Sequence, residues 1–314
     1  MIINPFCADL GWLFSDIRQH FHNCPLVLEY PDLGILASET PTHADSWLAI
    51  RSWEAPLLQW PERSVIQIHA LDPRLILGNH CEPRHIDAAA GLVFTHPEQP
   101  GILRDMGVSL EGKKCLLRPI GALGCFHTRT AMSDTPTFAW VGRDTGAKRT
   151  HLFCDAAEQL AKAVDICTVL VGEHLEGHFT RLATTVYNAT LHERRHTPIE
   201  DYPPIYQRCD AIVITSALEA GPMCLYEALA SGVPVITTRC GWAEYLIQDG
   251  INGYLIDEDS ERHMAEAIAH RMLDIASHRT EWFERRQLIA ASLMGWSLES
   301  WIEDNVRLAM EVAR

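Results

Sequence analysis

The chain has 314 residues, of which 47% are hydrophobic and 21% charged, and its formal net charge is −15. This length exceeds that of one ordinary compact domain, so we expect two domains. The negative charge disfavours a protein that captures nucleic acid or anionic lipid through a basic surface. No run approaches the roughly 20 apolar residues that cross a bilayer, and the amino terminus lacks the features of a signal peptide, so the sequence predicts a cytoplasmic protein.

The cysteines and histidines do not form the spacings that are typical of metal sites. The 10 cysteines are scattered singly without a CxxC pair, and the 16 histidines include no HExxH motif. We therefore expect reduced thiols and no bound metal ion.

Short apolar runs alternate with segments of helical period, a pattern that is typical of parallel βα units. In the first half we expect helices at 12–22 and 97–106 and strands at 26–30, 65–69, 75–78 and 91–95. A Gly- and Thr-rich stretch without periodicity then predicts a linker. The expected division is a first domain at 1–120, a linker at 121–135, a second domain at 136–296 and a terminal segment at 297–314.

The alternation restarts more clearly after the linker. We expect strands at 138–142, 168–172, 211–215, 233–237 and 253–256, with helices at 151–164, 223–231 and 261–275. This order predicts a doubly wound sheet. Residues 297–312 have apolar side chains at helical spacing behind Ser297, so they predict a terminal helix with a serine N-cap.

The loop and helix at 216–232, SALEAGPMCLYEALASG, follow the apolar run AIVIT. Ligands of open α/β sheets bind beyond the carboxyl ends of the strands, so this loop lies where a ligand would bind. Glu219 is in the loop and Glu227 about one turn inside the helix, whose first N–H groups, from Met223 on, suit a phosphate. Taken alone, two such carboxylates are more often solvated surface charges.

Two cationic residues upstream favour a functional role for these carboxylates. The run FAWVG ends at Gly142 and is followed by Arg143 and, in GRDTGAK, by Lys148. At the end of a strand, an arginine with forked hydrogen bonds and a lysine with a mobile point charge can neutralise a diphosphate. On its own this pair is about as often an exposed turn with two solvated cations.

Together these segments resemble the retaining GT-B glycosyltransferases of the EX7E family, glycosyltransferase family 4. The resemblance is carried, in order, by VGRDTGAK, LEAGPMCLYEALASGVPVITT and CGWAEYLIQDGINGYLI, and it extends over about residues 90–310. It implies an α/β fold of the GT-B type, in which two Rossmann-like, doubly wound domains face across a cleft and a C-terminal helix packs back on the body. The first domain would take the acceptor, and the second would bind a nucleotide-sugar.

The resemblance also implies roles for individual residues. Arg143 and Lys148 would hold the donor diphosphate and stabilise the leaving nucleoside diphosphate without a metal ion. Glu219 would contact the donor sugar and Glu227 the ribose. Further donor contacts would come from Gly142, Gly221, Pro222, Met223, Cys224 and Leu225. No cofactor is implied, and the donor substrate would be a UDP- or GDP-sugar.

Two departures from the family pattern fall in these segments. Arg149 stands where a glycine commonly follows the lysine, and the loop reads EAGP rather than EGFG. Neither departure removes a side chain with an implied role. Both bear on the shape of the sugar pocket.

The first domain of this family supplies a Gly-rich loop and a histidine near the transferred sugar. Gly11, in DLGW, is the candidate for the loop, and His69 and His80 are candidates for the histidine because each ends an apolar run. His96 is a third candidate, near the acceptor. Each histidine taken singly is more often structural than functional.

The sequence leaves the acceptor open between a carbohydrate, a lipid-linked or small-molecule acceptor and, with less support, a modified base in DNA. A non-catalytic sugar-nucleotide-binding protein with the GT-B fold and an epimerase also stay open, because a fold alone does not establish an activity. The joint presence of two cations and two carboxylates disfavours the non-catalytic protein, since a scaffold needs none of them.

Overall fold

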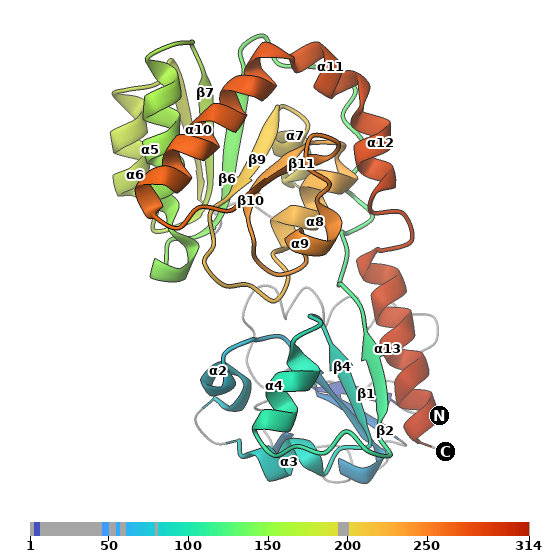
Figure 1. The fold of residues 1–314 in the computed structure, drawn as a ribbon. Helices are drawn as coiled ribbons and strands as arrows, with labels where there is room; N and C mark the ends of the chain where they lie inside the picture. The colour runs from blue at the N-terminus through green and yellow to red at the C-terminus, as the bar shows by residue number, and fades with distance from the viewer. Residues whose placement is uncertain are drawn as a thin grey trace. The chain divides into compact units, whose positions relative to one another are not determined.

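The computed structural model describes residues 3–6, 46–49, 55–56, 61–78, 81–193 and 201–313. The chain divides into two compact units, one formed by Met1–Ile120 with Trp296–Arg314 and the other by Gly121–Gly295. The first unit is therefore built from two separate stretches of chain (Figure 1). The helix predicted at 12–22 and the strand predicted at 26–30 lie outside the described residues.

The first unit contains a parallel sheet in the order β1-β2-β3-β4-β5. Its strands are β1 (Ile3–Phe6), β2 (Ser46–Ala49), β3 (Ser64–Ile68), β4 (Gly91–Phe94) and β5 (Lys114–Leu117). The strands predicted at 65–69 and 91–95 are confirmed as β3 and β4, which are buried along their whole length. Burial on both faces explains why these two read as continuous apolar runs.

Short helices connect these strands, and one long helix closes the unit. They are the 3-10 turn η3 (Pro61–Arg63) and the helices α2 (Pro73–Leu77), α3 (Pro83–Asp87), α4 (Gln99–Asp105) and α13 (Leu298–Val312). The predicted helices at 97–106 and 297–312 are confirmed as α4 and α13. The N-cap of α13 is Ser297, whose hydroxyl accepts from the backbone N–H of Ser300 at 3.1 Å.

The strand predicted at 75–78 is wrong, because these residues belong to α2. The side chain of Asp72 caps the helix by accepting from the backbone N–H of Arg74 at 2.8 Å, and Pro73 occupies the first turn. Gly78 ends the helix with a φ of 58°. Capping signals on both sides therefore decide the structure of an apolar run that is too short to show a period.

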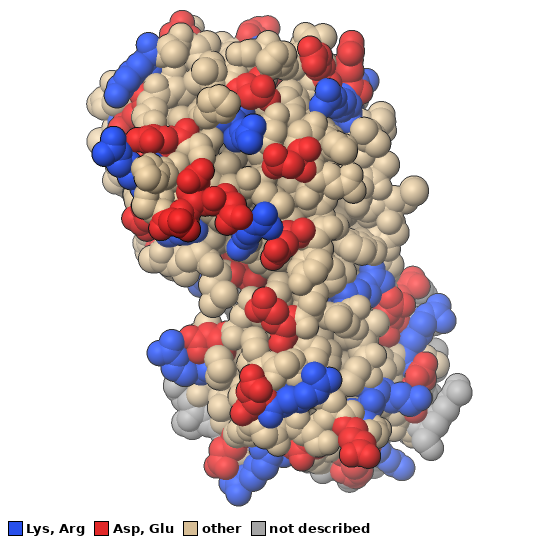
Figure 2. Space-filling model, viewed as in Figure 1, with Lys and Arg blue, Asp and Glu red and all other residues tan. Residues whose placement is uncertain are grey.

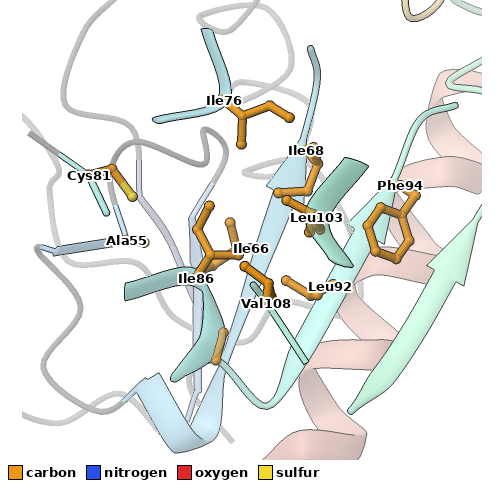
Figure 3. Packing of buried hydrophobic residues seen from close by; sticks show 11 residues of the cluster. Ala55, Ile66, Ile68, Ile76, Cys81, Ile86, Leu92, Phe94, Leu103 and Val108 are labelled. Carbon is orange, nitrogen blue, oxygen red and sulfur yellow. The ribbon is translucent and has the colours of Figure 1, made fainter. Parts of the chain in front are cut away.

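The core of the first unit lies between the central strands and the short helices (Figure 3). It contains Ala55, Ile66, Ile68, Ile76, Cys81, Ile86, Ala89, Leu92, Phe94, Leu103 and Val108. Helix α13 packs on β2, β3, β4 and β5, and it buries Trp301 and Val306 completely. The side-chain amide of Gln67 in β3 donates to Asn305 Oδ1 at 2.9 Å in this interface.

The second unit contains a six-stranded parallel sheet in the order β11-β10-β9-β6-β7-β8. Its strands are β6 (Thr137–Arg143), β7 (Cys167–Glu173), β8 (Asn188–Glu193), β9 (Ala211–Ile214), β10 (Val235–Thr238) and β11 (Gly253–Ile256). The five predicted strands of this half are confirmed, with the start of β10 shifted from 233 to 235. The edge strand β8 was not predicted, because it is only partly buried and its sequence is polar.

Helices lie on both sides of this sheet. They are α5 (Thr150–Ala161), α6 (Glu176–Ala183), α7 (Pro203–Tyr206), α8 (Met223–Ala230), α9 (Ala243–Leu246), α10 (Glu261–Ser277), α11 (Arg279–Glu284) and α12 (Arg286–Ala291), with the 3-10 turn η4 (Gly146–Lys148) before α5. Figure 1 shows α5, α6 and α10 on one side and α7, α8 and α12 on the other. This arrangement confirms the doubly wound sheet, and the helices predicted at 151–164, 223–231 and 261–275 are confirmed as α5, α8 and α10.

Within the described part of the chain, none of these helices is long and apolar enough to cross a bilayer.

Candidate active site

The strand order of the second unit reverses between β6 and β9, which are neighbours in the sheet but lead into helices on opposite faces. At such a reversal the loops after the two strands diverge and leave a crevice beyond their carboxyl ends, where ligands of open α/β sheets bind. We call residues 144–149 the first loop and residues 215–222 the second loop. They contain four of the ten residues to which the sequence assigned a role in binding the donor, and the other six directly precede the first loop or lie in the helix that follows the second.

The first loop begins directly after Arg143, the last residue of β6. Arg143 is exposed, and no acidic side chain in the described ranges pairs with it. The strands beneath it approach closely, because a Cβ atom on Gly172 of β7 would lie 1.6 Å from the carbonyl oxygen of Gly142. Arg143 therefore leaves the sheet at a tightly packed strand end, with its charge available to a ligand.

Lys148 ends the turn η4 and faces the second loop. Its Nζ is in direct contact with Glu219 Oε1, and both side chains are partly buried. Burial alone would lower the pKa of Lys148, but the charge of Glu219 and its hydrogen bond outweigh burial and raise that pKa above its ordinary value. The lysine is therefore a full cation that is already paired with the carboxylate.

Backbone and side-chain hydrogen bonds join the two loops. Thr215 Oγ1 donates to the carbonyl oxygen of Lys148 at 2.6 Å, and the N–H of Ala217 donates to the carbonyl oxygen of Ala147 at 2.7 Å. Thr215 is itself held by Trp140, whose indole N–H donates to Thr215 Oγ1 at 3.0 Å. The first loop, with Lys148, and the second loop, with Glu219, are thus held to each other and, through Trp140, to the sheet.

The second loop is packed against the segment that contains Gly241. Gly241 has a φ of 56°, and a Cβ atom there would lie 3.1 Å from the carbonyl oxygen of Glu219. A Cβ atom on Gly221 would lie 2.5 Å from the hydroxyl oxygen of Tyr226. Both glycines therefore allow close packing that a larger residue would disturb, and the tyrosine occupies the space beside Gly221.

Helix α8 begins at the end of the second loop, with Pro222 as its N-cap. The side chains of Cys224 and Leu225 are buried, and the backbone N–H of Leu225 donates to the carbonyl oxygen of Pro222 at 3.0 Å. Cys224 can therefore offer a ligand only its backbone. The first N–H groups of a helix have no partner within it, and they carry the positive end of the helix dipole. This end of α8 can accept an anion such as a phosphate.

Glu227 lies in the second turn of α8 and is 5% exposed. Its carboxylate accepts a hydrogen bond from the hydroxyl of Tyr206, which is fully buried. Burial, followed by the charge of Glu227, raises the pKa of Tyr206 well above its ordinary value, so the hydroxyl remains protonated and donates. A buried carboxylate needs such partners, and Tyr206 fixes the orientation of Glu227.

The candidates in the first unit have different surroundings. His69 follows β3, with its Nε2 at 2.9 Å from Gln67 Oε1 and its ring 6.1 Å from that of Trp301. His96 is buried after β4, and its Nδ1 accepts from the backbone N–H of Glu98 at 3.3 Å. Gly11 and His80 lie outside the described residues.

Several residues of the site were not singled out from the sequence. Ser216 Oγ donates to Glu219 Oε1 at 3.0 Å, and Tyr206, Tyr226 and Trp140 complete the surroundings described above. Thr215 and Ser216 could have been identified from the sequence, because they directly follow β9, where ligands of such a sheet bind. Tyr206 could not, because it belongs to the four-residue helix α7, which shows no pattern that points to a site. No group of three or more metal-ligating side chains occurs among the described residues.

Comparison with protein families bears directly on this region. The model of the family described as "Glycosyl transferases group 1" matches residues 135–274, which include both loops and α8. This part of the chain belongs to the group 1 glycosyltransferases. The assignment agrees with the resemblance carried by the sequence motifs of residues 135–274, which we call the group 1 domain.

Curated relatives match the chain over part of its length. A D-inositol 3-phosphate glycosyltransferase of Corynebacterium urealyticum is 32% identical over 77 residues, which are 24% of this chain and 18% of that protein. Spore coat protein SA of Bacillus subtilis is 25% identical over 169 residues, 50% of this chain and 44% of that protein. The chain thus spans less than half the length of these relatives.

Solved structures resemble the chain over nearly its whole length. Anabaena Alr3699/HepE in complex with UDP-glucose has a TM-score of 0.66 at 17% identity, covering 99% of this chain and 90% of that one. The apo form of the lipopolysaccharide outer core galactosyltransferase WaaB has a TM-score of 0.65 at 15% identity, covering 98% and 99%. These likenesses show that the chain has the GT-B fold.

Proposed function

We propose that this protein transfers a sugar from a nucleoside-diphosphate sugar to an acceptor hydroxyl with retention of configuration and without a metal ion. The observation that carries the proposal is the contact between Lys148 and Glu219 at the switch point of the group 1 domain, where the exposed Arg143 ends β6. One cation and one carboxylate are thus held together where a ligand of this sheet binds. A diphosphate and a sugar hydroxyl are the two groups that this pair can recognise.

The diphosphate would be bound by three features of the second unit. Arg143 would form forked hydrogen bonds with phosphate oxygens, and Lys148 would share its charge between Glu219 and the diphosphate. The start of α8 would donate backbone N–H groups. When the bond between the anomeric carbon and the diphosphate breaks, these cations stabilise the charge that develops on the leaving group, a role that a metal ion fills in other enzymes.

The sugar and the nucleoside would be held by the two carboxylates. Glu219 would accept from sugar hydroxyls and Glu227 from the ribose. Tyr206 already holds one oxygen of Glu227, which limits the directions from which a ribose hydroxyl can approach. The UDP-glucose in the complex of Anabaena HepE favours a uridine donor, with a GDP-sugar as the other candidate.

The acceptor would be bound by the first unit, with His96 as a candidate contact. His69 or His80 would lie near the transferred sugar, and the segment around Gly11 would supply the Gly-rich loop. On the face of the described chain that Figure 2 displays, basic and acidic side chains are mixed and form no continuous basic patch. This distribution favours a carbohydrate, lipid-linked or small-molecule acceptor over DNA, because nucleic acid is usually bound by clustered Lys and Arg.

A donor screen tests the proposal. UDP-, GDP-, ADP- and TDP-sugars are added to the purified protein, and the shift in melting temperature and the release of nucleoside diphosphate are measured. We expect one donor to stabilise the protein. Arg143→Ala should weaken binding of that donor by about 10- to 100-fold, the loss of a charge-assisted hydrogen-bonding group, without changing the stability of the free protein.

Arg262→Ala is the matched control, because Arg262 is an exposed arginine of the same unit whose one ion pair within the described ranges is with Glu266, across one helix turn. Glu227→Gln should also weaken binding while it keeps the shape of the buried side chain. If no donor stabilises the folded wild-type protein, the proposal is wrong. Binding without any turnover would favour a non-catalytic sugar-nucleotide-binding protein.

A further inference from the structure

Arg149, the residue between Lys148 and α5, has an unusual backbone. Its φ is 50° and its ψ is 46°, in the left-handed region. The only other non-glycine residue with a positive φ in the described ranges is His174. A side chain at this conformation costs roughly 1 kcal/mol, which glycine avoids. An arginine there therefore needs a compensating interaction.

The guanidinium group of Arg149 makes that interaction with the end of β9 and with α10. Its Nε donates to the carbonyl oxygen of Thr215 at 2.8 Å, and its Nη2 donates to that of Ser216 at 3.1 Å. Its Nη1 lies 3.4 Å from Met264 Sδ. All three nitrogen atoms thus have a protein partner, and no described carboxylate pairs with the group. The fork points at the second loop.

These bonds complete the connection between the two loops. Thr215 and Ala217 of the second loop donate to the carbonyl oxygens of Lys148 and Ala147. Arg149 adds two bonds in the opposite direction, from the first loop to carbonyl oxygens of the second. The carbonyl oxygen of Ser216 also accepts from Thr238 Oγ1 at 2.6 Å, which ties the second loop to β10. Lys148 therefore stands in the chain between Ala147 and Arg149, which are both hydrogen-bonded to the second loop.

We propose that Arg149 is a positioning residue of the donor site, whose guanidinium fork holds the second loop against Lys148 so that Lys148 and Glu219 meet the donor together. The inference rests on the proposed function. Three of the five N–H groups of Arg149 have protein partners, and the two bonds to carbonyl oxygens both hold the second loop, so the role proposed for Arg149 is to position that loop. It replaces the conformational freedom of a glycine with a rigid contact, and its charge adds to the positive potential of the site.

Arg149→Gly isolates this role, because glycine relieves the left-handed backbone while it removes the fork. We expect the variant to fold and to bind UDP about 10- to 100-fold more weakly than the wild type, as measured by titration calorimetry. Millimolar guanidinium ion, far below denaturing concentrations, should restore much of the affinity by filling the vacated space. Ammonium ion at the same ionic strength should not.

His174→Gly is the matched control, because it relieves the same kind of backbone at an exposed residue outside both loops. It should bind UDP like the wild type. Hydrogen exchange provides a readout without any nucleotide. Arg149→Gly should speed exchange at Ala217, whose N–H is bonded to Ala147, and guanidinium ion should slow it again.

The outcomes separate the two ideas. A wild-type protein that binds none of UDP, GDP, ADP and TDP would overturn the proposed function and the role of Arg149 in donor binding. A wild type that binds UDP, beside an Arg149→Gly variant with equal affinity and unchanged exchange at Ala217, would overturn the positioning role alone. Weaker binding that guanidinium ion does not restore, with unchanged exchange, would also contradict it.

Discussion

Two fully buried tyrosines of the second unit differ in what their hydroxyl groups contact. Tyr206 donates to Glu227, whereas the hydroxyl of Tyr226 is buried and has no hydrogen-bond partner among the described residues. Burying a hydroxyl without a partner costs about 1–3 kcal/mol. Tyr226 instead fills the space beside Gly221. Its ring therefore stabilises the fold by packing, whereas its buried hydroxyl lowers the stability.

Substitution of each tyrosine by phenylalanine should therefore change stability in different directions. Tyr206→Phe should lower the free energy of unfolding by about 1–3 kcal/mol, because the buried carboxylate of Glu227 loses a donor. Tyr226→Phe should leave that free energy unchanged or raise it, because no hydrogen bond is lost. Urea denaturation of both variants checks this. Equal destabilisation by the two substitutions would contradict the assignment of partners.

At the scale of elements, the end of β6 depends on how closely β7 approaches it. The carbonyl oxygen of Gly142 occupies the position that a side chain on Gly172 would need. The backbone rather than a flexible side chain is the obstacle, so it cannot move aside without separating the strands. Arg143 follows Gly142 directly, which links the packing of the two strands to the geometry of the site.

Inserting a group into a well-packed core typically costs about 1–3 kcal/mol. Gly172→Ala should destabilise the protein by at least that amount, because the backbone is the obstacle, and it should weaken donor binding. Gly177→Ala is the comparison, because a Cβ atom on Gly177 of α6 would meet nothing within 4 Å. In a helix this change should stabilise by about 0.5–1 kcal/mol. Thermal denaturation of both variants measures the contrast, and a stable Gly172→Ala protein would show that the strands can separate cheaply.

At the scale of the whole molecule, each unit has its own sheet and its own buried core, and the last helix of the chain belongs to the first unit. Trp301 of α13 is fully buried in that unit, next to the Asn305 that binds Gln67. Heat should therefore unfold the protein in two transitions, one for each unit.

Trp301→Ala should lower one of these transitions and spare the other, because the cavity that it leaves costs about 3–5 kcal/mol in the first unit alone. Differential scanning calorimetry measures both transitions. The transition that stays in place should be the one that a bound nucleoside diphosphate raises, since its proposed ligands lie in the second unit. A uniform shift of both transitions would show that the units unfold together.

Much of the second unit could be predicted from the sequence, because its strands are short buried runs and its main helices have clear periods. The misassigned run at 75–78 and the overlooked strand β8 show where this fails: a capped five-residue helix and a polar edge strand both lack the period that identifies an element. The candidate residues Arg143, Lys148, Glu219 and Glu227 were found from motifs, and their roles remain predictions.

The sequence by itself determined the family of residues 135–274, the doubly wound order of their elements and the residue types of the site, because strand runs, glycines and charged residues at fixed spacings are local properties of the chain. Only the tertiary structure decided which of these residues meet. The contact of Lys148 with Glu219, the hydrogen bond of Tyr206 with Glu227 and the fork of Arg149 each join segments that the chain separates by 71, 21 and 66 residues. The contacts of Lys148 and Arg149 depend on the strand order that brings β6 beside β9, and the bond of Tyr206 depends on the packing of α7 on α8. No local pattern encodes these distances.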